Sequence, residues 1–373
     1  MKKICHISIN HPRYDQRIVE KECLSLKMAG YDVYVIANDN LDDEVYKGIK
    51  IISIDMPLGT KLKRFKAIKR ALTVALDLNA DIYHIHEPDL LMIALKLKAH
   101  KKIVIFDSHE YYRDQINFRG INSNLGKRII RKIYTCYEKY YIKRIDAVIF
   151  PTDEYIVNNE IIAPFRYEAK KVIYIGNYPK DIILRKNNNS NNKFTLCYAG
   201  RLSDSRGITN LIQACYKTDC KLILAGIFDT IEYKNRITED KCFSCVDYLG
   251  RCSLDEVYNI YSKSDVGVSL LKNIGQYYKG RNLPTKLYEY MQCSLPIICN
   301  DSPYIIELNE KYNFCITVNP DNIDEIVKAI MLLKDNSEYR KKLGENGYKL
   351  MSNKFKWEND AQKLIEFYDE LEY

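Results

Sequence analysis

A regular alternation of short apolar runs with helical stretches constrains this chain more than any other feature. Strand-like runs at residues 3–9 and 31–37 are separated by a helical pattern at residues 16–29, which Gly30 closes as the residue after the helix. Strands separated by helices at this spacing form a parallel sheet with helices on both faces. The first half continues with strands expected at 49–54, 82–86, 103–107, 147–150 and 172–175 and helices at 62–78, 90–98 and 124–144.

The same alternation restarts after a polar linker. A turn ends at Pro179, and residues 186–193 are a low-complexity run with nothing to bury, so we place a domain boundary near Pro179. Since 373 residues, 46% of them hydrophobic, are too many for one ordinary domain, two domains are expected. The second half has strands expected at 194–199, 221–225, 246–250, 266–271, 295–299 and 314–318 and helices at 208–216, from 286, and at 304–308, 323–333, 338–351 and 357–373.

Composition argues against several classes of protein. No apolar run approaches the length of a transmembrane helix, and the first three residues lead into a strand-like run rather than the apolar region of a signal peptide, so we expect a cytoplasmic protein. The twelve cysteines lie mostly inside apolar runs, which is typical of reduced, buried thiols. Cys242, Cys245 and Cys252 have no histidine nearby and lack a fourth ligand, so no structural zinc is expected there.

The net charge of +8 is concentrated in two helical segments of the first half, residues 61–70 and 127–144, where Lys and Arg are interleaved with Ile, Leu and Tyr. Basic amphipathic helices suit an anionic membrane surface, which makes such a surface a candidate partner. A solvated helix face explains the same pattern equally well. Nucleic acid is not expected as a partner, because no nucleic-acid-binding signature accompanies the charge.

Polar clusters follow three of the strands expected in the first half, at residues 11–17, 86–89 and 107–110. Ligands of parallel sheets bind beyond the carboxyl ends of the strands. The position of His109 at such an end favours a functional role over that of an ordinary buried histidine. In the first cluster Asp15 is interpreted as a helix cap, whereas Arg17 is a candidate phosphate ligand through its guanidinium group.

Two stretches of the second half have the chemistry of a diphosphate site. Arg201 and Arg206 flank the start of a helix, and Gly200 lets the backbone approach a ligand closely. Further along, a Leu-Pro-Thr sequence precedes the helix that begins at Lys286, so the backbone N–H groups of this helix are expected to face the crevice at the strand ends. Glu289, one turn inside the helix, is placed to accept hydrogen bonds from the paired hydroxyls of a ribose.

These motifs resemble the donor half of a GT-B glycosyltransferase of the retaining family 4, also called glycosyl transferases group 1, and are similar to those of bacterial capsule, O-antigen and exopolysaccharide transferases. The run Leu-Pro-Thr-Lys-Leu-x-Glu-Tyr at residues 283–290 is similar to a run of one branch, which has Asn in place of Thr285. The resemblance implies an α/β protein with two Rossmann-like, doubly wound domains that face each other across a cleft. We expect an acceptor-binding domain at residues 1–179, a nucleotide-sugar-binding domain at 180–355 and a C-terminal helix at 356–373 that crosses back onto the first domain.

The chain departs from the family pattern at three places. Glu289 matches the second glutamate of the family's Glu-x7-Glu pattern, which holds the donor ribose, but the first glutamate is replaced by Arg281. Many members have a Gly-Gly pair in the first loop, where residues 11–17 contain none, and the family's usual Lys is Arg206 here. The replacement at position 281 bears on how the donor sugar is recognised.

The resemblance implies transfer of a hexosyl or N-acetylhexosaminyl group, with retention of configuration, from a nucleotide-diphosphate sugar to a hydroxyl of a glycan acceptor. A UDP-sugar is the favoured donor, and a lipid-linked glycan of bacterial surface polysaccharide synthesis is the expected acceptor. Such an enzyme is expected in the cytoplasm, peripherally at the inner face of the plasma membrane.

The site residues follow from the matches to the family. No cofactor or metal ion is expected, because protein cations can stabilise a leaving diphosphate and no Asp-x-Asp lies between apolar runs. The catalytic residues expected are His109, Arg201, Arg206 and Lys286; the donor-binding residues are Gly200, Arg201, Arg206, Gly250, Pro284, Thr285, Lys286, Leu287 and Glu289; and the acceptor or sugar contacts are Arg17, His86, Glu110 and Arg281.

Two other functions stay open at this point. A nucleotide-sugar 2-epimerase shares the GT-B architecture but transfers no sugar to an acceptor. A non-catalytic basic binding module with a degenerate donor site would account for the arginine at position 281.

Overall fold

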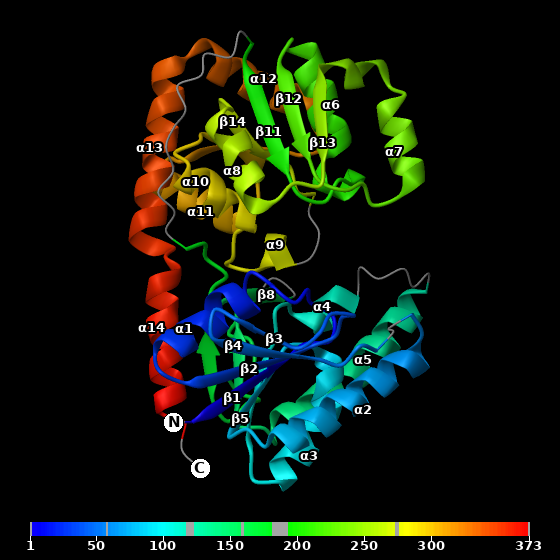
Figure 1. Ribbon diagram of the computed structural model, residues 1–373. Helices are drawn as coiled ribbons and strands as arrows, with labels where there is room; N and C mark the ends of the chain where they lie inside the picture. Colours follow the sequence, from blue (N-terminus) through cyan, green and yellow to red (C-terminus); the bar gives the residue numbers. More distant parts are fainter. Residues whose placement is uncertain are drawn as a thin grey trace. The chain divides into compact units, whose positions relative to one another are not determined.

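The computed structural model describes residues 2–56, 59–116, 123–157, 160–180, 193–272 and 276–371 (Figure 1). The chain forms two compact units, one of residues Met1–Asn177 with Trp357–Tyr373 and the other of residues Tyr178–Lys356, called unit 1 and unit 2 below. The polar linker expected at residues 186–193 lies outside the described residues except for Lys193. Within the described part of the chain, no helix has an apolar stretch long enough to cross a bilayer.

Unit 1 is built on an eight-stranded sheet with the strand order β10-β7-β6-β5-β1-β2-β4-β3. Neighbouring strands are parallel except at the edge, where β3 is antiparallel to β4. The direction in which the chain adds strands reverses between β1 and β5, and doubly wound sheets bind ligands at the carboxyl ends of strands at such a reversal. The strands are β1 (Lys3–Ile7), β2 (Asp32–Ala37), β3 (Glu44–Tyr46), β4 (Ile49–Ser53), β5 (Ile82–Ile85), β6 (Ile103–Asp107), β7 (Ala147–Phe150) and β10 (Val172–Tyr174).

Helices bury both faces of this sheet (Figure 1). One face packs against a core that contains the fully buried rings of Tyr83 and Phe106, and the other against a core that contains Ile4 and Trp357. The first face is covered by α2 (Lys61–Leu78), α3 (Leu91–Ala99) and α5 (Asn124–Ile142), and the second by α1 (Leu24–Met28) and α14 (Trp357–Asp369).

The segment expected to form one helix at residues 16–29 consists of two parts. A π-helical turn, η1 (Ile18–Cys23), continues directly into α1. Oδ1 of Asp15 accepts hydrogen bonds from the backbone N–H groups of Arg17 and Ile18, both at 2.9 Å, as the cap of a helix start does. Gly30 has a φ of 96°, which agrees with the left-handed residue expected after the helix.

The helix α14 completes the core of unit 1 although it follows unit 2 in the sequence. Trp357 is 2% exposed, and its Nε1 donates a hydrogen bond to Oγ of Ser25 (3.0 Å). The hydroxyl of the fully buried Tyr368 lies 2.7 Å from Nδ1 of His84. Oδ2 of Asp360 accepts a hydrogen bond from the backbone N–H of Gly176 (2.5 Å). These contacts tie α14 to the helix and strand ends of unit 1.

Unit 2 is built on a six-stranded, fully parallel sheet with the order β13-β12-β11-β14-β15-β16. The direction in which the chain adds strands to the sheet reverses between β11 and β14. The candidate ligand edge of this sheet therefore lies at the carboxyl ends of these two strands. The strands are β11 (Thr195–Ala199), β12 (Lys221–Ala225), β13 (Val246–Gly250), β14 (Val266–Ser269), β15 (Ile297–Asn300) and β16 (Cys315–Val318). Helices α6 (Ile208–Lys217) and α12 (Ile323–Asp335) cover one face, α8 (Leu254–Ser262), α10 (Thr285–Gln292) and α11 (Pro303–Tyr312) cover the other, and α13 (Ser337–Lys354) packs along both cores.

The elements that the sequence patterns did not predict are mostly short. A strand of three residues or a helix of four has too few positions to show a period. The helix α8 is an exception, because Ser253 and Glu256 form a capping box that is visible in the sequence. The unpredicted elements are β3, η2 (Pro88–Leu90), α4 (Tyr112–Gln115), β8 (Tyr155–Val157), β9 (Glu160–Ile162), η4 (Asp204–Arg206), α7 (Ile231–Thr238), η5 (Lys241–Cys245), α8 and α9 (Gln276–Lys279).

Gly267 in β14 is a position where only glycine fits. A Cβ atom there would lie 2.5 Å from Cγ of Tyr290, whose ring is fully buried and whose hydroxyl is within hydrogen-bonding distance of two backbone carbonyls. We expect Gly267→Ala to lower the free energy of unfolding by about 1–3 kcal/mol, because the ring must move. Gly59→Ala is the control, because no atom lies within 4 Å of a Cβ at that exposed residue. Equal denaturation midpoints for both variants would contradict this packing.

Candidate active site

Three strand ends of unit 2 meet in a tight arrangement of glycines. Gly200 follows β11 with a φ of 140°, and Gly226 follows β12 with a φ of 137°. A Cβ atom on Gly226 would lie 1.7 Å from the carbonyl oxygen of Gly200, so a larger residue cannot replace it. The backbone N–H of Gly226 also donates to the carbonyl of Gly250 (2.6 Å), which ends β13. The glycines therefore hold the backbones of three neighbouring strands close together at the ligand edge of the sheet.

Lys286, in the first turn of α10, points a buried cation at this edge. The residue is 7% exposed, and its Nζ lies 3.7 Å from the centre of the Tyr198 ring. A Cβ atom on Gly200 would lie 3.2 Å from the same Nζ, so the ammonium group is adjacent to the glycine turn. Burial lowers the pKa of Lys286 well below its ordinary value, with the charge of Arg206 acting in the same direction and that of Glu289 opposing it. An anion bound beside Nζ would favour the charged form.

Glu289 lies on the second turn of α10 and is half-buried. Its Oε2 accepts a hydrogen bond from the hydroxyl of Tyr261 (2.9 Å). Burial, followed by the adjacent carboxylate, raises the pKa of the Tyr261 hydroxyl well above its ordinary value, so this hydroxyl stays a neutral donor. The hydrogen bond with Tyr261 thus orients the Glu289 carboxylate one turn along α10 from Lys286.

Arg201 and Arg206, the two arginines that follow β11, differ in exposure. Arg201 is 69% exposed and forms an ion pair through Nε with Asp229. Arg206 is half-buried at the end of η4 and is close enough to Lys286 to lower the pKa of that residue. Gly207 follows with a φ of 68°, and a Cβ atom on it would lie 2.4 Å from the carbonyl oxygen of Leu270. This glycine lets the arginine turn pack against the end of β14.

In unit 1, Glu87 organises the loop that follows β1. Its side chain is 3% exposed, and Oε1 accepts hydrogen bonds from Oγ of Ser8 (2.6 Å) and the backbone N–H of Asn10 (3.0 Å). Nδ1 of His11 lies 3.0 Å from the same oxygen. Burial lowers the pKa of His11, but the hydrogen bond and charge of Glu87 outweigh this and raise it above its ordinary value. The loop after β1 is therefore tied to the end of β5.

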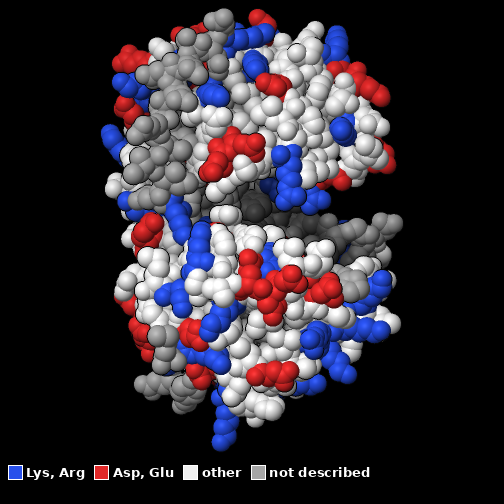
Figure 2. Space-filling view, viewed as in Figure 1, with Lys and Arg blue, Asp and Glu red and all other residues white. Residues whose placement is uncertain are grey.

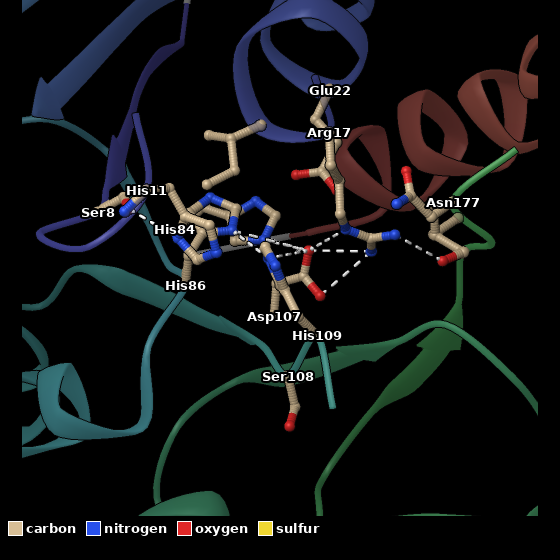
Figure 3. A network of polar contacts seen from close by, with 12 residues as sticks. Ser8, His11, Arg17, Glu22, His84, His86, Asp107, Ser108, His109 and Asn177 are labelled. Carbon is tan, nitrogen blue, oxygen red and sulfur yellow. Dashed lines mark hydrogen bonds and ion pairs between the residues drawn. The ribbon is translucent and has the colours of Figure 1, made fainter. Parts of the chain in front are cut away.

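Arg17 and Asp107 form a buried ion pair at the end of β6 (Figure 3). Oδ2 of Asp107 accepts hydrogen bonds from Nε (3.1 Å) and Nη2 (3.0 Å) of Arg17, and Nε also lies 3.0 Å from Oε1 of Glu22. Nη1 donates to the carbonyl of Ile175 (3.1 Å), and Arg17 is only 5% exposed.

The same contacts shift the pKa values of the two carboxyl groups beside Arg17. Burial raises the pKa of Asp107, but Arg17, His109 and His84 together hold it well below its ordinary value. Burial, with the charge of Asp107, raises the pKa of Glu22 well above its usual range.

Five of the six histidines of the chain gather at this edge of the unit 1 sheet (Figure 3). His6 on β1 is paired in register with His84 on β5, and the rings of His84 and His86 stack with centres 4.4 Å apart. His109 lies in the turn after β6, and 15% of its side chain is exposed, whereas the side chains of His84 and His86 are fully buried. The fifth member, His11, lies beside His109, with the ring centres 4.8 Å apart.

Two family models match the chain. The model of glycosyl transferases group 1 matches residues 179–350, and the model of glycosyltransferase family 4 matches residues 16–177. The chain belongs to the GT-B glycosyltransferases of group 1. The family and the α/β fold class that the sequence motifs predicted are thereby confirmed.

Known proteins resemble this glycosyltransferase over nearly their whole length. An uncharacterised glycosyltransferase of Methanocaldococcus jannaschii is 24% identical over 373 residues, which covers 99% of this chain and 98% of the relative. The structure of sucrose-phosphate synthase from Thermosynechococcus elongatus matches with a TM-score of 0.77 at 17% identity, covering 99% of this chain and 98% of the other. The structure of Anabaena HepE in complex with UDP-glucose matches with a TM-score of 0.71 at 13% identity over 100% of both chains. These structural likenesses show the fold.

The structure of the glycosyltransferase brings several predicted donor residues together. Gly200, Lys286 and Glu289 lie at one edge of unit 2, with Arg206 close enough to influence Lys286. Pro284 precedes the first residue of α10, Thr285 is exposed, and Gly250 lies in the glycine arrangement described above. Their roles in binding a donor stay predictions.

Two predicted site residues, Arg17 and Leu287, have partners inside the protein. Arg17 is committed to Asp107 and Glu22 inside unit 1, so its guanidinium group is not presented to a phosphate. Leu287 is fully buried in the core, and its backbone N–H donates to the carbonyl of Pro284. These contacts argue against direct ligand contacts by the two side chains, and their roles in the site stay predictions.

Arg281 and Glu110 have surface positions that the motifs did not specify. Nη1 and Nη2 of Arg281 donate to the two carboxylate oxygens of Glu307, at 2.5 and 2.7 Å, and the guanidinium group lies over the ring of Tyr304. The backbone carbonyl of Glu110 accepts a hydrogen bond from Oγ of Ser108 in the turn after β6. Arg281 is therefore paired with a carboxylate and has the opposite charge to the glutamate of the family pattern.

Sequence reasoning missed most of the buried polar network of unit 1. The patterns predict His6 and His84 as parts of strands and Glu22 as part of a helix, and they place Asp107 in the polar cluster at residues 107–110 without a partner. A signal was present for His84 and His86, because positions two apart in a strand face the same side. The register that sets His6 beside His84 depends on strand order, which no local pattern gives.

Arg13, in the loop after β1, forms an ion pair with Asp39 that is less buried than the pair of Arg17 and Asp107. It is 6% exposed, and its Nε and Nη2 donate to the two oxygens of Asp39 at 2.8 and 2.7 Å. The hydrogen bond with Arg13 lowers the pKa of Asp39 below its ordinary value. A carboxyl whose pKa is lower in the folded state stabilises the fold above its unfolded pKa of about 3.9 and loses this contribution as the pH falls through its folded pKa.

We therefore expect Arg13→Gln to lower the free energy of unfolding by about 2–3 kcal/mol at pH 7, and the difference from the unsubstituted protein to shrink below about pH 4. Urea denaturation at a series of pH values measures this difference. Arg70→Gln, at an exposed position of α2, is the control and should stay within about 0.5 kcal/mol at every pH. A difference that grows as the pH falls would contradict the assignment.

Proposed function

We propose that this glycosyltransferase moves a hexosyl or N-acetylhexosaminyl group, with retention of configuration, from a nucleotide-diphosphate sugar to a hydroxyl of a lipid-linked glycan. The observation that carries the proposal is the position of Lys286. A buried ammonium group beside the glycine turn at Gly200, with Glu289 one turn further along the same helix, has the chemistry of a site for a diphosphate and a ribose. The likeness to HepE in complex with UDP-glucose supports a UDP-sugar as the donor.

The proposed chemistry places the charge of the leaving group on unit 2. The bond between the anomeric carbon and the diphosphate oxygen breaks, a bond from that carbon to the acceptor oxygen forms on the same face, and the departing diphosphate takes the acceptor proton. Lys286 and Arg206 would stabilise the developing negative charge, with Arg201 contributing from the exposed side. In this proposal protein cations do the work that a metal ion at the diphosphate does in other transferases.

An apolar pocket in unit 1 supports a lipid-linked acceptor. The pocket has a volume of about 780 Å³ and lies against α2, α3 and α5. Lys61 lies on its wall beside Phe65, and Arg64 forms an ion pair there with Asp89. An anionic group next to an apolar chain would find a cation in Lys61. The pocket is lined by Asn10, Lys61, Arg64, Phe65, Ile68, Glu87, Pro88, Asp89, Met92, Tyr112, Ile116, Ile130 and Tyr134.

The surface of α2 and α5 supports attachment to an anionic membrane. Leu62 and Phe65 on α2 are 66% and 50% exposed, and Ile129 and Ile133 on α5 are 50% and 64% exposed. Lys and Arg side chains gather around these apolar groups, as the lower right of Figure 2 shows for this face of the molecule. Apolar side chains ringed by cations on exposed helices are typical of peripheral binding to acidic lipids. The enzyme would then meet its acceptor at the membrane surface.

A thermal-shift series with UDP, GDP, ADP and CDP tests the donor site. One nucleoside diphosphate at a hundredfold excess over its dissociation constant should stabilise the protein by about 2.7 kcal/mol. Lys286→Met should abolish this ligand shift without lowering the stability of the free protein, because it replaces a buried cation by an apolar side chain of similar shape. Glu289→Gln should weaken the shift, and Lys341→Met, at an exposed position of α13, should leave it unchanged.

The proposal fails if no nucleoside diphosphate shifts the unsubstituted protein, and a non-catalytic binding module then becomes the better description. If a UDP-sugar binds but is isomerised in the absence of any acceptor, the activity is that of a 2-epimerase. Formation of a glycosylated lipid-linked product, detected by mass spectrometry, supports transfer.

Vesicle flotation tests the membrane face separately. We expect flotation with vesicles that contain phosphatidylglycerol in low salt and much less with phosphatidylcholine alone. Lys63→Glu with Lys66→Glu on α2 should lower the partition coefficient at least about thirtyfold, because each lysine near an acidic surface contributes about 1 kcal/mol. Lys341→Glu with Lys342→Glu on α13 makes the same change of charge on unit 2 and is the control. Equal losses in the two double variants would show that net charge, rather than this surface, is responsible.

A further inference from the structure

Three ligand atoms converge where β5 and β6 end in unit 1 (Figure 3). Nδ1 of His86 lies 3.1 Å from Nε2 of His109. Oδ2 of Asp107 lies 3.7 Å from that Nδ1 and 3.5 Å from that Nε2. The three atoms therefore form a nearly equilateral triangle made of two imidazole nitrogens and one carboxylate oxygen.

The size of this triangle matches one face of a metal-coordination tetrahedron. Ligands held about 2.0–2.1 Å from a tetrahedral ion are separated from one another by about 3.3–3.4 Å, whereas neighbouring ligands of an octahedral ion are about 2.9 Å apart. The three measured separations lie around the first value, and all three exceed the second. Two imidazoles with one carboxylate are also a ligand set that zinc takes in sites with an open fourth position.

We propose that His86, Asp107 and His109 form a binding site for a divalent transition-metal ion, with Zn²⁺ as the ion whose coordination they fit. No Asp-x-Asp motif marks this site in the sequence, because its ligands come from the ends of two strands. The site departs from the expectation of a metal-free protein, and it does not rest on the proposed donor chemistry, since its residues all belong to unit 1.

The surrounding contacts are those that metal ligands require. Metal-binding histidines usually hold their second ring nitrogen in a hydrogen bond, and ligating carboxylates are bound by further groups. Nε2 of His86 lies 2.9 Å from Nδ1 of His6, which turns Nδ1 of His86 towards the triangle. Asp107 is held by Arg17, because Oδ2 accepts hydrogen bonds from Nε and Nη2 and Oδ1 accepts one from Nη2 (3.2 Å). Two of the three ligands are thus oriented by partners outside the triangle.

A buried polar atom beside the triangle lacks a partner. Nε2 of His84 is fully buried, lies 3.9 Å from Oδ2 of Asp107 and has no hydrogen-bond partner among the described residues. Its Nδ1 is already engaged with the hydroxyl of Tyr368. An unsatisfied buried polar atom is costly. When Nδ1–H of His84 donates to Tyr368, Nε2 has a lone pair, which a bound cation would stabilise electrostatically.

The partly exposed side chain of His109 gives the site a route to solvent. His86 and Asp107 are fully buried, whereas His109 is 15% exposed and has the ring of His11 beside it. An ion would therefore enter, and keep its open position, on the His109 side. Because His109 was a predicted catalytic residue, an ion bound to its Nε2 would also occupy that nitrogen.

Hydrogen bonding alone is the competing explanation of the triangle. A proton shared between Nδ1 of His86 and Nε2 of His109, with Asp107 as a second acceptor, accounts for the same separations without an ion. The two explanations differ in whether the protein binds metal with a defined stoichiometry.

Metal titration of the full-length protein decides between them. After treatment with a chelator, the protein is titrated with Zn²⁺ against a chromophoric competitor and with Co²⁺ in the visible range. We expect one high-affinity equivalent of Zn²⁺, a Co²⁺ spectrum of tetrahedral nitrogen and oxygen coordination, and a rise in melting temperature with Zn²⁺. His109→Ala should weaken this equivalent by about a hundredfold or more, because the loss of a ligand exceeds the 10- to 100-fold effect of losing a second-shell partner. His109→Ala is suitable because the side chain is partly exposed, and circular dichroism checks its folding.

Two further variants make the result specific. His109→Cys keeps a metal ligand, so it should retain binding and add a thiolate-to-cobalt charge-transfer band. His100→Ala removes the sixth histidine, which is exposed, and should bind Zn²⁺ as the unsubstituted protein does. The proposal is overturned if no stoichiometric Zn²⁺ binds, if His109→Ala binds like His100→Ala, or if the Co²⁺ complex of the unsubstituted protein already shows thiolate charge transfer, which would place the ion on cysteines instead.

Discussion

The carboxyl ends of parallel strands lie at one edge of a sheet, and both candidate sites depend on this constraint. In unit 1 the strand order reverses between β1 and β5, which sets His6 beside His84 in register and collects polar side chains from three strand ends. In unit 2 the reversal between β11 and β14 sets the turn at Gly200 beside Lys286 at the start of α10. The same topology thus gives one unit an imidazole- and carboxylate-rich edge and the other a cationic edge with close backbones.

The buried guanidinium group of Arg17 stabilises the fold of unit 1. Arg17 is shared by Asp107 and Glu22, and all three side chains are at most 5% exposed. Removing one partner from such a group leaves an uncompensated buried charge, which costs about 3–5 kcal/mol. The arginine therefore links η1 to the end of β6, and its hydrogen bonds help to orient the buried Asp107 carboxylate beside the histidine cluster. Lys286 is the contrasting case, because its buried charge has an aromatic ring and glycine backbone beside it.

The sequence predicted most of the sheet and helix framework, because strands such as β6 and helices such as α2 are long enough to show their period. Family motifs located the predicted donor-binding residues Gly200, Lys286 and Glu289 in one unit, and the structure brings them to one edge. Side-chain partners were not predictable in the same way. The guanidinium group of Arg17 could bind phosphate, yet the position of η1 beside the end of β6 pairs it with Asp107. The histidine triangle likewise depends on which strands are neighbours.

The return of the chain to unit 1 at Trp357 has a consequence for biosynthesis. Residues Tyr178–Lys356 form unit 2 in the middle of the chain, so Trp357 and Tyr368 leave the ribosome only after all of unit 2 has been made. Until then the face of the unit 1 sheet that α14 covers lacks its partner, and the apolar side chains around Ile4 and Leu26 stay without part of their core. A nascent chain that stops short of α14 therefore contains all residues of unit 2 but an incomplete unit 1, whose apolar face stays exposed longest during synthesis.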